Sequence, residues 1–463
     1  MTNNYKFAFI FLGYILLSCT GCSGSDPVIS STDSDPVIPI TDLSFSKFGY
    51  SGGIADVDAD GSEEIAVGAP DAEGKGALLI YSAAGELEYS IESPKEGYNF
   101  ASAFAALPDV NGDGTNDFAV GALHADGMSP LSGAVFVYNG TAPPTLLWTL
   151  KGESPLDKFS YRIAGGDFND DGLGDIAVSA VYATGSVYQA GRVYIYFGGA
   201  TEPETADVIL DGDHEDHGTG LALEMVDVNG DSIDDLLVGN WNSVRIYYGG
   251  SAAAANLSTS SDPDVTIKGA NPRSFSPYSG LSFGDTIESL GDISGDGIND
   301  FAIANPRRSE PDTSDDKGAV YIYKGSSSYP ISFFENDTQY LQLKILGEDT
   351  HHWFGSSMAK TDGGGLLVGA KWAPGENGTV RVAGNVYHFD LQALLSTGVS
   401  TVLAHEAAIS TYSADTQSGE FSKSLDASGD SFLAGAPYAD ANEGRAFSFS
   451  LSSGIKIELG ESL

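Results

Sequence analysis

The chain has 463 residues, of which 41% are hydrophobic and 11% aromatic, so it can build a substantial core. It is strongly acidic: 64 Asp and Glu against 22 Lys and Arg give a formal net charge of −42. Such a surface repels nucleic acid and anionic membranes, which excludes a DNA- or RNA-binding role and leaves membrane attachment only to an N-terminal lipid anchor.

Residues 1–22 resemble a bacterial lipoprotein signal. A basic residue precedes the eleven apolar residues 7–17, which are too few to span a bilayer comfortably. Cys19 follows a small residue and has a Leu three positions before it, so it is the expected lipidation site, with Cys22 as the alternative. An ordinary cleaved signal peptide and a membrane anchor helix are the other interpretations. The protein is expected to be exported and lipid-anchored to the cell envelope, at the outer membrane or cell surface.

Both cysteines of the chain lie in this signal segment, so the exported body has no disulfide framework. Residues 23–44 begin with a Ser/Asp-rich run and are interpreted as a flexible tether. Residues 45–463 are expected to form the folded domain, and something other than disulfides must hold its loops together.

One sequence unit recurs seven times in this domain. Each copy starts with an aromatic and a small residue, continues through an acidic loop and an Ala/Val-Gly-Ala-type segment, and then alternates aliphatic and Tyr residues. The alternation predicts strands, and a polar-apolar run that closes most copies brings them to four per unit. The starts are Phe48-Gly49, Phe100-Ala101, Phe159-Ser160, His217-Gly218, Phe283-Gly284, Phe354-Gly355 and Phe421-Ser422.

Seven such units predict an all-β fold, a seven-bladed β-propeller of four-stranded antiparallel blades, because closing the circle removes exposed ends. A linear solenoid is the alternative. Two runs compete for the fourth strand of the last blade, residues 455–460 and residues 37–41. The C-terminal run is favoured because Pro36 and Pro39 suit an edge or a linker better.

The first five copies carry an acidic loop with one spacing, Asp-x-[Asp/Asn/Ser]-x-Asp-x-x-x-[Asp/Glu]. Calcium takes about six to eight hard oxygen ligands, which side chains at positions 1, 3, 5 and 9 and the backbone carbonyl at position 7 could supply. About five calcium ions are therefore expected, in a structural role. The predicted ligands are Asp56, Asp58, Asp60, Ser62 and Glu64; Asp109, Asn111, Asp113, Thr115 and Asp117; Asp167, Asn169, Asp171, Leu173 and Asp175; Asp227, Asn229, Asp231, Ile233 and Asp235; and Asp292, Ser294, Asp296, Ile298 and Asp300.

Asp, Asn and Gly are also ordinary turn formers, but five loops at the same place in the repeat favour calcium. A Gly at position 6 allows the sharp bend, and the fourth loop is weaker because Ser232 replaces that Gly. The last carboxylate at position 9 and the strand that follows differ from an EF-hand. The sixth and seventh copies, at 361–365 and 426–430, lack the full ligand set, and no ion is expected there.

The Phe-Gly starts, the Gly-Ala-Pro segments at 68–70 and 435–437 and the acidic loops resemble the FG-GAP repeats of integrin alpha chains, related to repeats in many bacterial exported proteins. The resemblance covers roughly residues 45–460. It implies a seven-bladed propeller with calcium in hairpin loops on one face and ligand binding on the opposite face.

The loops after the second strand and before each Phe-Gly start would lie away from the calcium face. They carry aromatic and Arg residues, which are common anchors for protein or glycan partners, although some of them could simply plug the propeller mouth. The candidates are Tyr182, Trp241, Arg307, Arg308, Trp372 and Tyr438.

The sequence shows no Gly-x-Ser-x-Gly elbow, no His-Glu-x-x-His and no phosphate-binding Gly loop. A binding or adhesion module is therefore favoured over an enzyme. A polysaccharide-active enzyme that uses a pair of carboxylates is one alternative, and a scaffold subunit of a cell-envelope complex is the other.

Overall fold

The computed structural model describes residues 46–214, 218–252, 257, 262–269, 283–308, 316–374, 383–413, 419–439 and 443–459. The predicted signal and tether, both cysteines, His217 and the alternative closing run at 37–41 lie outside these residues. The chain divides into residues 1–38 and 39–463, and every described residue belongs to the second part. Within it, no described helix combines the length and hydropathy that crossing a membrane requires.

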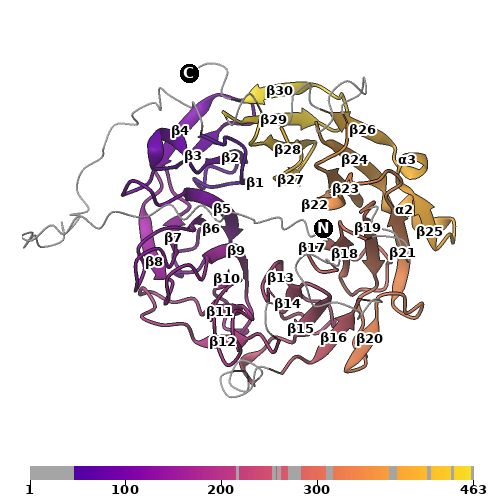
Figure 1. The fold of residues 1–463 in the computed structure, drawn as a ribbon, viewed down its shortest axis with the longest axis horizontal. Helices are drawn as coiled ribbons and strands as arrows, with labels where there is room; N and C mark the ends of the chain where they lie inside the picture. Colours follow the sequence, from indigo (N-terminus) through magenta and orange to yellow (C-terminus); the bar gives the residue numbers. More distant parts are fainter. Residues whose placement is uncertain are drawn as a thin grey trace, which may run out of the picture. The chain divides into compact units, whose positions relative to one another are not determined.

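Seven β-sheets stand as blades around a central axis, which confirms the predicted seven-bladed propeller (Figure 1). Four strands of each blade pair antiparallel in chain order, and the first strand lies innermost. Blades 1 to 4 consist of β1 (Gly52–Ala55), β2 (Glu64–Ala69), β3 (Ala77–Tyr81) and β4 (Leu87–Glu92); β5 (Phe100–Leu107), β6 (Asp117–Ala122), β7 (Ala134–Asn139) and β8 (Leu146–Lys151); β9 (Phe159–Gly166), β10 (Asp175–Ala180), β11 (Arg192–Tyr196) and β12 (Val208–Asp211); and β13 (Leu223–Val226), β14 (Asp235–Asn240), β15 (Ser243–Tyr247) and β16 (Val265–Lys268).

Blades 5 to 7 follow the same order. The strands are β17 (Thr286–Gly291), β18 (Asp300–Asn305), β19 (Ala319–Tyr323) and β21 (Leu341–Leu346); β22 (Phe354–Thr361), β23 (Gly365–Ala370), β24 (Asn385–Asp390) and β26 (Ser410–Ser413); and β27 (Leu425–Ser428), β28 (Ser431–Ala436), β29 (Arg445–Ser450) and β30 (Lys456–Leu459). Short helical segments lie in the connections: η1 (Ala72–Gly74) in blade 1, and α2 (Leu391–Ser396) and α3 (Ala404–Ala407) in blade 6.

Every blade has the four antiparallel strands predicted from the sequence, and the sheets of blades 4 and 5 each gain a fifth strand. β20 (Ser332–Phe334) lies between β19 and β21 in the chain but pairs parallel to β16 of the preceding blade. In the same way β25 (Thr401–Leu403) lies between β24 and β26 and pairs parallel to β21. Each insertion ties a blade to its neighbour at the outer edge. Strands of three residues show too little alternation to be recognised in a sequence.

The Phe-Gly starts mark a bend at the entry to each blade. The small residue has a positive φ in all seven copies: 85° at Gly49, 62° at Ala101, 77° at Ser160, 59° at Gly218, 104° at Gly284, 94° at Gly355 and 76° at Ser422. Glycine reaches this conformation without steric cost, which explains its recurrence. The Phe before it is buried in the six described copies and packs edge-on against the third strand, as Phe159 does against Tyr194 at 5.4 Å between ring centroids.

The glycine of the Gly-Ala segment allows the next blade to approach closely. A Cβ at Gly68 would lie 2.3 Å from the carbonyl oxygen of Ala101, and one at Gly435 would lie 1.9 Å from that of Gly49. The second pair joins the last blade to the first. A side chain at these positions would push neighbouring blades apart. The Gly-Ala segment of one blade therefore packs directly against the Phe-Gly start of the next blade at each of these boundaries.

The hydrophobic core lies between the blades. Each of seven buried clusters draws its residues from two adjacent blades. Blade 7 closes the ring against blade 1, where Leu433 and Leu459 pack with Val67 and the Phe48 N–H donates to the Glu443 carbonyl at 3.2 Å. β30 is the fourth strand of blade 7, so the C-terminal run completes that blade as favoured from the sequence.

Candidate functional site

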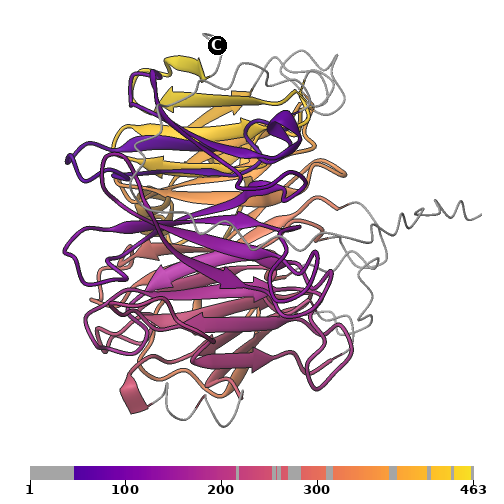
Figure 2. The same cartoon turned by 90° about the vertical axis from the view of Figure 1, so that its left-hand side faces the viewer.

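The acidic loops lie together at one end of the propeller. Because the strands of a blade alternate in direction, the loops between first and second strands share one face, and those between second and third strands share the other (Figure 2). All five acidic loops join a first to a second strand, and the ninth loop residue opens the second strand. We call this end the acidic face, formed by the loops 56–64, 109–117, 167–175, 227–235 and 292–300.

The five loops share one hydrogen-bond pattern. The carboxylate at position 1 accepts a bond from the N–H at position 6, as Asp109 does from Gly114 at 2.7 Å, and all five loops repeat this bond. The carboxylate at position 5 accepts from the N–H at position 7. The carboxylate at position 9 accepts from the N–H at position 2 in loops 1 to 4 and at position 3 in loop 5. These bonds hold alternate side chains on the inside of each loop.

Position 6 has a left-handed backbone in every loop, including the one that lacks glycine. The φ angle is 87° at Gly61, 92° at Gly114, 86° at Gly172, 90° at Gly297 and 71° at Ser232. The fourth loop therefore adopts the same bend as the others, with a backbone conformation that costs a non-glycine residue free energy.

Three loops contain buried oxygens without a hydrogen-bond partner among the described residues: Asp56 Oδ1, Asp117 Oδ1 and Asn169 Oδ1. Ligand atoms of Asp56, Asp58 and Glu64 lie within 4.8 Å of one another, the only such group of His, Cys, Asp or Glu in the described part of the chain. A buried oxygen without a partner is costly, and a cation would satisfy it. Because the donors are carboxylate and amide oxygens, the residues fit a hard cation such as Ca²⁺.

Burial raises the pKa of the carboxyl group at position 9. The pKa of Glu64 and of Asp175 is raised to about 7, and that of Asp117 to about 6, each chiefly because burial disfavours the charged form. In the first loop, the negative charges of Asp58 and Asp60 raise the pKa of Glu64 further. A divalent cation bound there would offset both effects.

Blades 6 and 7 have short turns where blades 1 to 5 have acidic loops. Only residues 362–364 separate β22 from β23, and only Gly429 and Asp430 separate β27 from β28. Such turns leave no room for a nine-residue loop with alternate inward side chains.

The six residues predicted for a ligand face all follow the second strand of a blade, so they lie on the face opposite the acidic loops. Tyr182 is 44% exposed, and the Lys158 ammonium lies 4.8 Å from its ring centroid. Arg308 is hydrogen-bonded to the hydroxyl of Tyr321, and burial raises the pKa of Tyr438 to about 12.

The other three residues, Trp241, Arg307 and Trp372, form a cluster with Trp353, a residue that was not predicted from the sequence. Trp353, just before the sixth Phe-Gly start, stacks on Trp372 with ring centroids 4.4 Å apart. The Arg307 guanidinium lies 4.6 Å from the Trp353 ring and 5.8 Å from the Trp241 ring. The Lys371 ammonium lies 4.9 Å from the Trp353 ring. These cation–π contacts link blades 4, 5 and 6.

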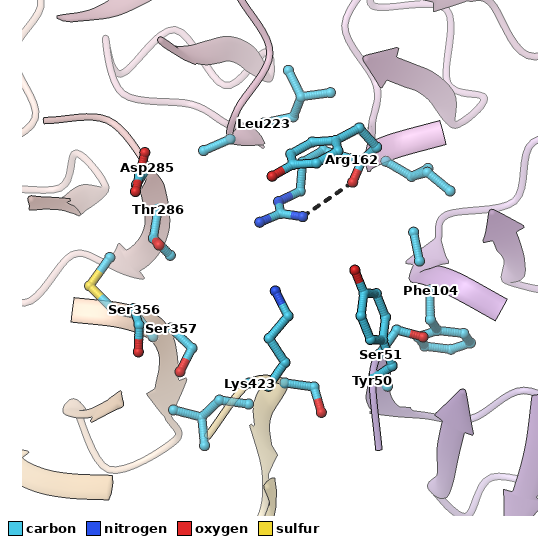
Figure 3. Close-up of a pocket in the computed structure, with 18 of the residues that line it drawn as sticks. Tyr50, Ser51, Phe104, Arg162, Leu223, Asp285, Thr286, Ser356, Ser357 and Lys423 are labelled. Atoms are coloured by element: carbon cyan, nitrogen blue, oxygen red, sulfur yellow. Dashed lines mark hydrogen bonds between the residues drawn. The ribbon is translucent and has the colours of Figure 1, made fainter. Parts of the chain in front are cut away.

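A cavity of about 310 Å³ opens at the mouth of the central channel on the same face (Figure 3). All seven blades line it, mostly with residues two or three positions after a Phe-Gly start. Tyr50, Arg162, Asp285 and Lys423 contribute polar groups to it (Figure 3). None of these residues was predicted from the sequence, and their place after the Phe-Gly start is the only signal that could have identified them.

Three carboxyl groups lie along the channel: Glu288 lines this cavity, and Glu224 and Asp426 line the adjoining one. Burial raises the pKa of Asp426 to about 6, and burial together with mutual repulsion raises the pKa of both glutamates. Glu288 accepts a hydrogen bond from the Lys360 N–H at 2.9 Å, and Asp426 accepts one from the Ile54 N–H at 2.8 Å. Both bonds join neighbouring blades, so these groups tie the innermost strands together.

Comparison with known proteins agrees with the repeat structure. The FG-GAP repeat model matches residues 48–81, 159–196 and 284–323, in blades 1, 3 and 5. Phosphatidylinositol-glycan-specific phospholipase D of Mus musculus is 31% identical over 248 residues, 48% of this chain and 26% of that protein. The phospholipase of Bos taurus is 25% identical over 325 residues, 60% of this chain and 38% of that protein.

Integrin alpha-6 of Gallus gallus is 31% identical over 258 residues, 51% of this chain and 23% of that protein. The chain thus spans between 23% and 38% of the length of these three relatives. The chain therefore contains FG-GAP repeats, folds as a seven-bladed β-propeller and is similar to integrin alpha chains over about half of its length.

Proposed function

We propose that the protein is an exported, calcium-stabilised binding module of adhesion type, which recognises a protein or glycan ligand through the face opposite the acidic loops. The observation that carries the proposal is the division of the propeller into two faces. One has five loops of shared hydrogen-bond geometry, and the other gathers tryptophan, tyrosine, arginine and lysine side chains around the channel mouth. The similarity to integrin alpha-6 supports it. Lipidation at Cys19, or at Cys22, would attach the module to the cell envelope, at the outer membrane or cell surface.

In this proposal each acidic loop binds one calcium ion, about five in all. Side chains at positions 1, 3, 5 and 9 and the carbonyl at position 7 would provide the ligands. The buried oxygens of Asp56, Asp117 and Asn169 would gain a partner. Because the chain has no cysteine after Cys22, calcium takes the place that disulfides have in many exported domains.

Calcium counting on the mature chain tests the metal part of the proposal. After chelation and titration, about five ions should bind per chain, and the melting temperature should rise with calcium concentration. Asp109→Ala should remove one ion, since it deletes the position-1 carboxylate of the second loop. Asp362→Ala, in the short turn of blade 6, is the matched control and should leave the count unchanged. A chain that binds no calcium and melts at the same temperature would contradict it.

A polysaccharide-active enzyme is the second candidate, because carboxyl groups with raised pKa beside a cavity can act as acid and base. Glu224, Glu288 and Asp426 are the groups that favour it. The phospholipase similarity covers 26% to 38% of those enzymes, which does not carry their activity to this chain. Hydrolysis of a polysaccharide, lost in Glu288→Gln, would establish the enzyme. Binding without turnover would favour the binding module, and co-purifying envelope proteins would favour a scaffold.

A further inference from the structure

A pocket of about 240 Å³ lies between blades 5 and 6, at the end of the propeller opposite the acidic loops. Its polar lining comprises two histidines, two carboxylates, one lysine and one tyrosine: His352, His405, Glu348, Asp349, Lys317 and Tyr387. Two of the seven histidines of the chain thus share one small pocket with two carboxylates. Imidazole and carboxylate together are ligands for a transition metal such as zinc, whereas calcium prefers oxygen alone.

The parallel pairing of β25 with β21 brings His405 to Glu348. The register places Leu403 opposite Leu346, and His405 and Glu348 each follow two residues later. The Nδ1 of His405 contacts the Oε2 of Glu348. The other inserted strand, β20, has no such pair, because Asn336 stands at the position that corresponds to His405.

A second histidine–carboxylate pair lies in the connection from β21 to β22. The Nδ1 of His352 lies 3.6 Å from the Oδ2 of Asp349. Burial lowers the pKa of His352, so its imidazole is neutral near pH 7, the form that binds a metal ion. Phe354 is buried two residues later, and its N–H donates to the Lys317 carbonyl at 3.3 Å, which holds the end of this connection against blade 5.

Glu348 provides a separate indication of a cation. Its Oε1 is buried and has no hydrogen-bond partner among the described residues, although its Oε2 contacts His405. A buried carboxylate oxygen without a partner costs free energy. Lys317 lines the same pocket but does not supply the missing bond. A metal ion bound beside His405 would satisfy this oxygen.

The two pairs must move closer together to share one ion. In the described part of the chain, only the first acidic loop has three candidate ligand atoms within 4.8 Å of one another. The side chains of His405 and Asp349 are 65% and 72% exposed, so both can turn toward the pocket without disturbing the core. Those of Glu348 and His352 are mostly buried and form the fixed part of the set.

We propose that this pocket binds one Zn²⁺ ion through His352, His405, Glu348 and Asp349. The two carboxylates balance the charge of the ion. Tyr387 stays outside the ligand set, because burial raises the pKa of its hydroxyl. The ion fastens the inserted strand β25 to the connection between blades 5 and 6. Blade 6 has no acidic loop, so this site holds together a part of the ring that the acidic loops do not reach.

Calorimetric titration of the mature chain with zinc chloride, in calcium sufficient to saturate the acidic loops, tests the site. One Zn²⁺ should bind per chain, and His405→Ala should weaken the binding at least about tenfold. Lys317→Met should tighten it, because a positive charge leaves the pocket. His124→Ala, an exposed histidine of blade 2, is the matched control and should change nothing. Absence of zinc binding, displacement of zinc by calcium, or unchanged binding in His405→Ala would overturn the proposal.

Amide hydrogen exchange locates the ion. Zinc should slow exchange in β25, at Thr401–Leu403, and leave β20, at Ser332–Phe334, unchanged. Glu348→Gln keeps the shape of the side chain without its charge and should remove the slowing. The melting temperature should rise with zinc in the wild-type chain but not in His405→Ala. Equal slowing in both strands would mean that zinc stabilises the ring from elsewhere, and would refute the site.

Discussion

Many of the Gly, Ala and Ser residues that recur in the repeats stand at positions where the backbone is left-handed. Ser232 adopts in the fourth acidic loop, at φ 71°, the conformation that glycine adopts in the other four. Ser232→Gly should therefore raise the free energy of unfolding by about 0.5–1 kcal/mol, because the strain removed exceeds the entropy that glycine adds to the unfolded chain. Denaturant melts of the chelated protein measure it. The reverse change, Gly172→Ser, should lower the free energy of unfolding. If neither substitution changed it, the strain assigned to position 6 would be contradicted.

At the scale of elements, each blade boundary depends on a glycine of the second strand. Gly435→Ala should destabilise the ring by about 2–3 kcal/mol, because the new methyl group would meet the Gly49 carbonyl, a backbone atom that cannot move aside. Gly363→Ala is the control, since nothing lies within 4 Å of a Cβ there. Thermal melting compares the two. Equal melting temperatures would mean that blades 7 and 1 are not held in this contact.

The inserted strand β20 should contribute to stability through one of its two phenylalanines. Phe333 is 5% exposed and lies 4.8 Å from Tyr340 between ring centroids, whereas its neighbour Phe334 is 60% exposed. Phe333→Ala should lower the free energy of unfolding by about 3 kcal/mol, and Phe334→Ala by less than about 0.5 kcal/mol. Chemical denaturation measures both. Equal effects would show that β20 does not pair with blade 4 in solution.

At the scale of the whole molecule, the proposed calcium ions are distributed unevenly around the ring. The acidic loops belong to blades 1 to 5, while blades 6 and 7 have short turns. Chelation should therefore speed amide exchange at residues 109–117 and the four equivalent loops, because their carboxylates would repel without a cation. Exchange at residues 362–364 and 429–430 should not change. Uniform acceleration around the ring would indicate global loosening instead.

The sequence by itself determined the blade count, the strand order and the position of the acidic loops. These depend on local patterns, the alternation along a strand and the spacing within a loop, and the sevenfold repetition separates such patterns from chance. The sequence also showed that Ser232 replaces the loop glycine and that the sixth and seventh copies lack a complete acidic loop. Each of these features depends only on the residues of one loop.

Only the tertiary structure decided what the channel mouth contains. Arg162, Asp285 and Lys423 are separated by more than a hundred residues from one to the next, and nothing in their neighbourhoods marks them in the sequence. They meet because the ring places the same position of every blade around one axis. The parallel strands β20 and β25 were missed for the same reason: each pairs with the preceding blade, and closure of the ring, not local propensity, selects that partner.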